Sequence, residues 1–312
     1  MMIQLQTYRS EMRETWNDAV RASRNGTFLF DRGFMDYHSD RFTDASLMFI
    51  RNGSVVALLP QTRHGSEWRS HGGLTYGGLV LSSEMTVTDV LEISDQIVEH
   101  AGVVGVSRQI VTPVPYIYHR QPSDEVRYAL FQAGAKLTAS KIDSVVNLRN
   151  PLKVKAQRKT GARRGLRAGL RLDDQGKPED LHELVRAGLL AKHGVSPVHS
   201  AAEMQLLQSR FPSNIRCWQI TSSDEELVAG AWVFESETCA HLQYSAASDK
   251  GRELRALDLL FSELIEYYPT RKDNFCFGTS NEGVRLNEGL LRQKTSFGAR
   301  GVVHETFEWI FA

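Results

Sequence analysis

The chain has 312 residues, enough for two domains of ordinary size. Its 37 basic and 37 acidic residues cancel, and this balance argues against general nucleic-acid binding, which depends on excess positive charge. No run approaches eighteen apolar residues, so we expect no membrane span, and the charged first residues lack the apolar core of a signal peptide. Three cysteines without paired spacing give no disulfide or zinc framework, so we expect a cytoplasmic protein without a metal.

The first half of the sequence alternates helical and strand-like patterns. The strand-like runs 46–53 and 54–63 meet at Asn52 and Gly53, a pair that predicts a tight hairpin turn. A glycine-rich apolar stretch follows at 70–81. Apolar spacing then predicts helices and strands in turn. The expected helices are 14–23, 87–103 and 124–137, and the later strands are 107–118 and 140–150.

Residues 151–171 hold eight Lys or Arg and no acid, and the acid-rich residues 172–180 follow, so we place a domain boundary at 150. The second half then repeats the order of the first: a hairpin, a strand, a helix, a strand, a helix and a last strand. We therefore predict an α/β protein with two domains of one kind, residues 1–150 and 151–312, each a mixed, mostly antiparallel sheet flanked by helices. The expected helices here are 180–194, 201–211, 253–268 and 287–298, and the strands are 213–223, 225–236, 238–248, 274–280 and 301–311.

Residues 241–256, HLQYSAASDKGRELRA, precede a long amphipathic helix. A strand, a loop and a helix in this order resemble the GNAT acetyltransferase superfamily, whose loop receives the pyrophosphate of coenzyme A. A helix N-terminus binds phosphate through its N–H groups and dipole, and glycine allows close approach. The resemblance implies that the second domain holds acyl-CoA. The implied contacts are Ser245, Ala246, Gly251, Arg252, Arg255 and Ala256.

Three further stretches make the resemblance more specific, namely residues 115–137, 192–215 and 275–300. They are similar to the FemAB-like branch of tandem GNAT proteins. That branch includes aminoacyl transferases of peptidoglycan bridges, and enzymes that N-acylate nucleotide-linked amino sugars for surface polysaccharides such as the O-antigen of lipopolysaccharide. The forms PVHS and LNEGL resemble the sugar group, in particular enzymes of dTDP-3-amino-3,6-dideoxyhexoses.

An amine that attacks a thioester must lose a proton, and the resulting oxyanion needs donors. In a GNAT fold the donor is a backbone N–H of the central strand, here within 243–246. Gln243 and Tyr244 are the side chains we expect beside the acyl group, although either can be an ordinary strand residue. His199 follows Pro197 in a loop and could be the base or a sugar ligand. Glu282 is the other candidate base, if desolvation raises its pKa.

Polar residues crowd past the strand 274–280, where ligands of open α/β sheets gather. Ser280, Asn281 and Asn287 could bind sugar hydroxyls, and the alternative is helix capping. Lys294 could reach a phosphate or a buried carboxylate, or lie in solvent. Four more residues could contact the nucleotide, namely Tyr76, Tyr118, His119 and Arg164. The alternative for the first three is packing within their own domain, and the alternative for Arg164 is a solvated helix.

We therefore expect an N-acyltransferase that moves an acyl group from acyl-CoA to a nucleotide-linked, dTDP-type amino sugar lying between the domains, without a covalent intermediate. A monomer is expected. One rival is an aminoacyl-tRNA-dependent transferase of peptidoglycan bridges, the only interpretation that includes a nucleic acid. The other rival is a non-catalytic GNAT-like binding module.

Overall fold

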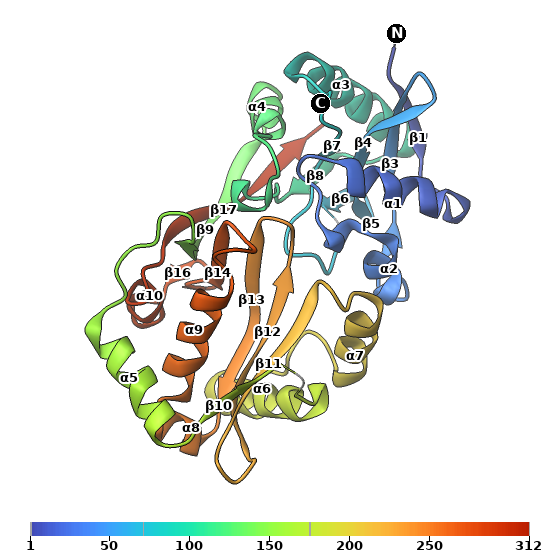
Figure 1. Cartoon of the computed structure of the whole chain (residues 1–312). Coiled ribbons are helices and arrows are strands. Elements are labelled where there is room, and N and C mark those ends of the chain that lie inside the picture. The colour runs from blue at the N-terminus through green and yellow to red at the C-terminus, as the bar shows by residue number, and fades with distance from the viewer. Residues whose placement is uncertain (1, 71, 175, 312) are drawn as a thin grey trace. The chain divides into compact units, whose positions relative to one another are not determined.

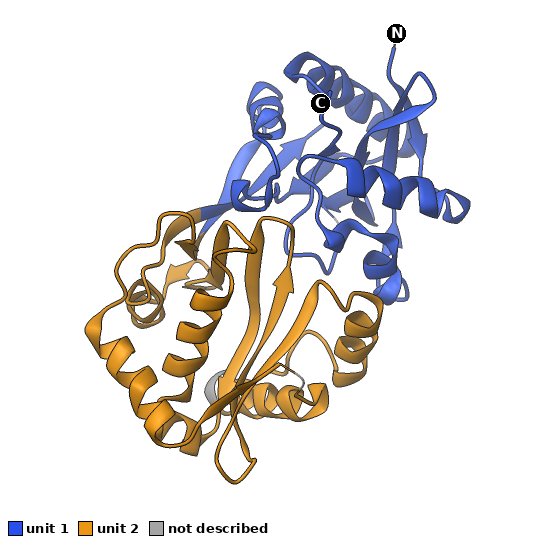
Figure 2. Cartoon of the chain, in the orientation of Figure 1, with its two compact units in different colours: residues 1–141, 303–312 blue, residues 142–302 orange. Residues whose placement is uncertain are grey.

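The computed structural model describes residues 2–70, 72–174 and 176–311, without the side chains of 192 and 193. The chain divides into two compact units, residues 1–141 with 303–312 as unit 1 and residues 142–302 as unit 2 (Figure 2). The division thus falls nine residues before the expected 150, and the last ten residues return to unit 1. The reason is that two long strands, β9 (Lys136–Asn147) and β17 (Arg300–Ile310), each contribute residues to both units.

Unit 1 contains two sheet segments with the strand orders β1-β3-β4-β7 and β17-β8-β6-β5-β2. The predicted hairpin is confirmed: β3 and β4 pair antiparallel, and Asn52 and Gly53 turn between them with φ of 54° and 77°. The core of the unit includes Leu59, Ile93 and Trp309. Its strands are β1 (Gln4–Thr7), β2 (Thr43–Asp44), β3 (Leu47–Arg51), β4 (Ser54–Leu59), β5 (Gln61–His64), β6 (Glu67–Ser70), β7 (Val80–Leu81) and β8 (Arg108–Val111), and its helices are α1 (Arg13–Ala22), α2 (Arg32–Met35), α3 (Val87–Val104) and α4 (Glu125–Gln132).

Unit 2 has the strand order β10-β11-β12-β13-β14-β9, antiparallel except for the parallel pair β13 and β14. The predicted mixed, mostly antiparallel sheet flanked by helices is confirmed (Figure 1). Its strands are β10 (Arg171–Asp173), β11 (Ile215–Thr221), β12 (Leu227–Glu235), β13 (Cys239–Ala247), β14 (Asn274–Thr279), β15 (Asn281–Glu282) and β16 (Arg285–Leu286), and its helices are α5 (Ala156–Arg167), α6 (Pro178–His193), α7 (Ala201–Arg210), α8 (Asp249–Glu253), α9 (Ala256–Tyr267) and α10 (Glu288–Thr295).

Helices cover both faces of the unit 2 sheet. On one face, α9 places Leu260 and Leu264 on Ala231 and Val233 of β12 in one continuous core. Each fully buried leucine stabilises the unit by about 1.5–3 kcal/mol. Helices α6 and α7 lie on the other face. Gly230 of β12 has no side chain there, which leaves room for Leu181 of α6. Within the described residues, no helix is both long and apolar enough to cross a membrane.

Candidate active site

Two neighbouring strands of unit 2 part from each other in mid-sheet. β13 and β14 pair in parallel only from Cys239↔Asn274 to His241↔Cys276, and the described residues show no pairing between them beyond that point. Gly278 then takes a φ of +70°, a conformation that glycine adopts without strain. We call the parted ends, residues 242–247 of β13 and 277–279 of β14, the β13–β14 opening. At this opening, the backbone groups by which β13 and β14 face each other are not paired between the two strands.

A β-bulge lies at the edge of this opening. Val233 pairs with Leu242 and Trp232 with Tyr244, so Gln243 is the extra residue of β13. Past the bulge, Ser248 N donates to Val228 O. Because N–H directions alternate along an antiparallel ladder, Ser245 turns its N–H away from β12 and toward the opening. The N–H expected within 243–246 is therefore best supplied by Ser245, whose side chain is exposed.

The bulge also sets the direction of Tyr244. It places Tyr244 opposite Trp232, on the face of the sheet covered by α6 and α7. There the Tyr244 hydroxyl and His199 Nδ1 share a hydrogen bond of 2.8 Å, and His182 Nε2 donates to the His199 carbonyl at 2.9 Å. Burial raises the pKa of Tyr244, opposed by hydrogen bonds from Gln243 and from the backbone at His199 and Val198. Tyr244 thus keeps its proton at neutral pH. The structure brings together two candidates that lie 45 residues apart in sequence.

The loop expected to receive pyrophosphate is a short helix instead. Residues 249–253 form α8, and Ser248 caps it by accepting from Gly251 N at 3.1 Å. A Cβ on Gly251 would lie 1.9 Å from Val228 O, so packing against β12 already requires this glycine. The Arg252 guanidinium donates to Ala247 O and pairs with Asp249. Sequence spacing could not reveal α8, although Ser248 is a recognisable N-cap residue.

The start of α9 carries a buried carboxylate that sequence reasoning missed. Asp258 is 4% exposed, and its oxygens lie 2.8 Å from Arg158 Nη1 and 2.7 Å from Arg255 Nη2. Asp258 occupies the third position of α9, where a carboxylate interacts well with the helix dipole. Ala256 is fully buried. Phosphate contacts at this point would therefore come from the exposed faces of Arg252 and Arg255 rather than from N–H groups of α9.

The polar residues past β14 mostly satisfy one another. Ser280 is fully buried, and its hydroxyl shares a 2.9 Å hydrogen bond with Ser144. Asn281 Oδ1 accepts from Ile142 N, and Asn287 caps α10. These contacts fit the capping alternative for Asn287, and they leave little of Ser280 for a ligand.

Two other polar candidates near β14 differ in exposure. Glu282 is exposed on the short β15–β16 hairpin, and its Oε1 accepts from Asn287 Nδ2 at 2.7 Å. Lys294 is 7% exposed and donates to two backbone oxygens, Gly278 O and Thr279 O. Lys294 is thus not a solvated lysine: its hydrogen bonds go to backbone oxygens, and the buried carboxylate of Asp143 acts on it electrostatically.

Three candidates lie in unit 1. Tyr76 and Tyr118 are buried with ring centroids 4.7 Å apart, and the Tyr76 hydroxyl donates to Thr27. His119 Nε2 lies 2.9 Å from Val114 O, and burial lowers the pKa of His119. These contacts fit the packing alternative, because a nucleobase would have to displace one ring from the other.

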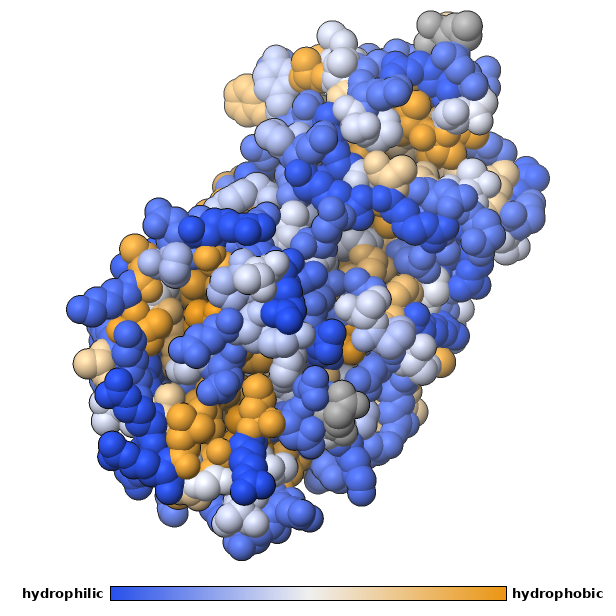
Figure 3. Space-filling view, in the orientation of Figure 1, coloured by the Kyte–Doolittle hydropathy of each residue, from blue (hydrophilic) through white to orange (hydrophobic). Residues whose placement is uncertain are grey.

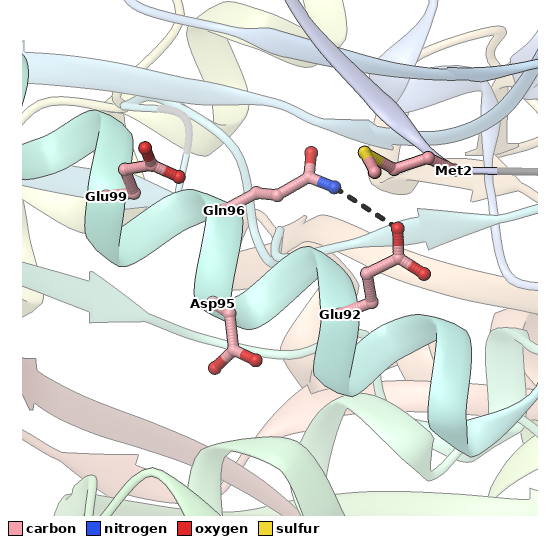
Figure 4. Close-up of a pocket in the computed structure, with 5 residues that line it drawn as sticks. All are labelled: Met2, Glu92, Asp95, Gln96 and Glu99. Carbon is pink, nitrogen blue, oxygen red and sulfur yellow. Dashed lines mark hydrogen bonds between the residues drawn. The ribbon is translucent and has the colours of Figure 1, made fainter.

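A surface hollow of about 580 Å³ lies beside α3 in unit 1, lined by Met2, Glu92, Asp95, Gln96 and Glu99. Figure 4 shows Gln96 directed at Glu92, while Asp95 and Glu99 point away from them. Three carboxylates repel a phosphate-bearing ligand, and the hollow includes none of the candidate residues. The described residues also contain no group of three or more acids, histidines or cysteines placed to hold a metal.

The basic run 151–171 is largely exposed, and its middle part forms helix α5. Arg164 is exposed on it, and Figure 3 shows hydrophilic side chains along this edge of unit 2. Gly161 and Gly165 of α5 lie against α9, so that a Cβ at Gly161 would be 2.0 Å from Asp258 Oδ2. The exposed cations are Lys153, Lys155, Lys159, Arg163, Arg164, Arg167 and Arg171, and none forms an ion pair with a described carboxylate.

Comparison with known proteins identifies the domain that carries this geometry. Residues 153–284 match the model of the acetyltransferase (GNAT) domain family. No curated protein matches the sequence. Among solved structures, FemX is similar with a TM-score of 0.69 and 10% identity, covering 98% of this chain and 97% of FemX.

Two further structures share the fold. The C-terminal domain described for a lysylphosphatidylglycerol synthetase of Agrobacterium fabrum has a TM-score of 0.62 and 17% identity, over 97% of this chain and 92% of that domain. A tandem GNAT protein from the clavulanic acid biosynthesis pathway has a TM-score of 0.53 and 11% identity, over 99% of each chain. Residues 153–284 are therefore similar to the GNAT acetyltransferase domain, which supports an acyltransferase activity, and the chain has the mixed α/β fold seen in tandem GNAT structures.

Proposed function

We propose that unit 2 transfers an acyl group to an amine by direct attack of the amine on the acyl carbonyl. The observation that carries this proposal is the hydrogen bond between Tyr244 of the bulged strand β13 and His199 of the α6–α7 loop, beside the β13–β14 opening. His199 takes a proton from the ammonium, and the neutral amine forms the new C–N bond. The oxyanion lies at the N–H of Ser245. As the bond to the leaving group breaks, Tyr244 gives that group its proton and takes up the second proton of the attacking nitrogen, which leaves a neutral amide. His199 then releases its proton to solvent.

For the donor and acceptor, we propose acyl-CoA and a nucleotide-linked amino sugar of the dTDP type. The match of residues 153–284 to an acetyltransferase family supports the donor. Arg252 and Arg255 would contact the diphosphate, with Ser245 and Ala246 beside the pantetheine arm. The polar groups of Asn281 and Glu282 support an acceptor rich in hydroxyls.

A second donor, aminoacyl-tRNA, is favoured by the surface of α5. Like charges at i and i+4 destabilise a helix, and Lys159, Arg163 and Arg167 form such a row on α5, with Lys155 just before it at the N-cap. The first turn of α5 also lacks an acid and a side-chain cap. A helix that breaks these local rules and is held by packing on α9 is typical of a functional surface. A row of cations about 5–6 Å apart suits a phosphate backbone.

Thermal unfolding with panels of ligands tests these proposals. We expect acetyl-CoA and a dTDP-amino sugar to raise the Tm, since a ligand that binds only the folded state stabilises it. A rise with aminoacyl-tRNA but not with acyl-CoA would replace the first donor with the second. No rise with either donor would favour a binding module without acyltransferase activity.

A further inference from the structure

Lys294 of α10 is a buried cation at the end of β14. Its Nζ donates to Gly278 O at 2.9 Å and to Thr279 O at 2.5 Å. Burying an ammonium costs stability unless it is well paired. An apolar side chain of similar length would fill this space without that cost. The position therefore calls for an explanation beyond packing.

The two acceptors of Lys294 lie beyond the end of the pairing with β13 and at an irregularity in the pairing with β9, which resumes at Thr279 and Asp143. Pairing with β13 ends at Cys276, and the register with β9 shifts between Cys276 and Thr279. Buried carbonyl groups need donors when a ladder ends. The ammonium supplies two donors at consecutive carbonyl groups, in the segment where Gly278 takes its positive φ. Lys294 thus replaces strand pairing on this side of the β13–β14 opening.

The opposite side of the opening is the acyl site. Gly278 lies close to β13, because a Cβ on it would be 3.5 Å from the His241 ring and 3.7 Å from Leu242 O. If β13 and β14 kept pairing in the same parallel register, Gly278 would lie beside Gln243, and Ser280 beside Ser245. A movement of residues 278–280 toward β13 would therefore cover the backbone around Ser245. The width of the opening therefore depends on what holds Gly278 and Thr279.

We propose that Lys294 is a positioning residue, which anchors Gly278 and Thr279 to α10 and so keeps the β13–β14 opening free for the acyl group. The inference rests on the acyl-transfer function proposed above, but its structural part can be tested without any substrate. Asp143 of β9 and Cys276 of β14 are the titratable groups that act on the Lys294 ammonium, and both are buried.

The test compares Lys294→Met, Lys294→Arg and Arg292→Met, the last removing an exposed cation from the same helix. Amide hydrogen exchange is measured for residues 277–281, at and just after the end of β14, and for β11 as an internal reference. We expect exchange at 277–281 to become about tenfold faster or more in Lys294→Met, with β11 and Arg292→Met unchanged, because two charge-assisted hydrogen bonds are lost. Unchanged exchange at 277–281 would overturn the proposal. If Lys294→Met does not fold, Lys294→Gln takes its place.

Kinetics with the acceptor and donor found by thermal unfolding give the second readout. A misplaced acyl site lowers kcat by about a hundredfold while KM changes little. Partial recovery in Lys294→Arg is expected, since a guanidinium can donate to the same two carbonyl groups. A loss confined to KM would show that Lys294 contacts substrate instead. If no donor or acceptor binds, the proposed function fails, while the exchange result still decides whether Lys294 holds β14.

Discussion

Replacing Asp258 with Asn tests how the start of α9 is built. The amide keeps the shape of the side chain but leaves the Arg158 guanidinium, 2.8 Å away and 14% exposed, facing a neutral group. Removing one partner of a buried ion pair costs about 3–5 kcal/mol. The lower end applies here, because Arg255 is 43% exposed and can turn to solvent. Loss of the carboxylate at the helix N-terminus adds about 0.5 kcal/mol. We expect a total loss of about 3.5 kcal/mol.

Urea unfolding of Asp258→Asn, Arg158→Met and the double variant measures this coupling. In the Arg158→Met background, Asp258→Asn should cost only about 1 kcal/mol, because the charge that needed a partner is gone. Glu253→Gln, which removes an exposed carboxylate of the adjacent α8, is the matched control and should change little. Costs that simply add in the double variant would refute the ion-pair argument.

Three further predictions follow from the same contacts. Gly251→Ala should destabilise unit 2 by about 1–3 kcal/mol in urea unfolding, because its Cβ would meet Val228 O; normal stability with lost donor binding would show instead that the glycine serves a ligand. Burial lowers the pKa of Lys294 from 10.5 to about 8, so the unfolded chain binds that proton more tightly than the folded chain does. Below pH 8 the buried charge therefore lowers the free energy of unfolding. This stability is recovered as pH rises from about 8 to 10.5. Relative to Lys294→Met, the wild type should gain about 3 kcal/mol over that window, and a difference independent of pH would contradict this. Arg163→Gln, Arg164→Gln and Arg167→Gln together should leave the Tm unchanged but lower the salt dependence of binding to labelled aminoacyl-tRNA, and an unchanged salt dependence would remove α5 from the donor site.

The order of elements was readable from the sequence because periodicity depends on local burial. The hairpin at Asn52 and Gly53 and the helices on both faces of unit 2 followed from this pattern. The bulge at Gln243 could not be read, because an extra residue in one strand is defined only by its partner strand. The point near Gly278 at which β14 parts from β13 likewise depends on contacts between strands that are far apart in the chain.

The structure brings some of the candidate site residues together and gives others packing contacts instead. Side-chain chemistry suggested His199 and the expected central strand suggested Tyr244, and folding brings the two within 2.8 Å. The ion pair of Arg158 and Asp258 spans 100 residues and left no local signal. Tyr76 and Tyr118 resembled ligand contacts because aromatic residues near glycine and proline fit either role, and only packing distinguishes the two.

The central claim is that the His199–Tyr244 pair carries out proton transfer at the acyl site. The most direct measurement is single-turnover acyl transfer by Tyr244→Phe and His199→Gln, with the donor and acceptor found by thermal unfolding, and Gln205→Ala on α7 as the control. We predict a fall of about 100- to 10,000-fold in each of the first two variants, without additivity in the double variant, because the two groups act as one unit. Wild-type rates in Tyr244→Phe and His199→Gln, with the Tm preserved, would contradict the account.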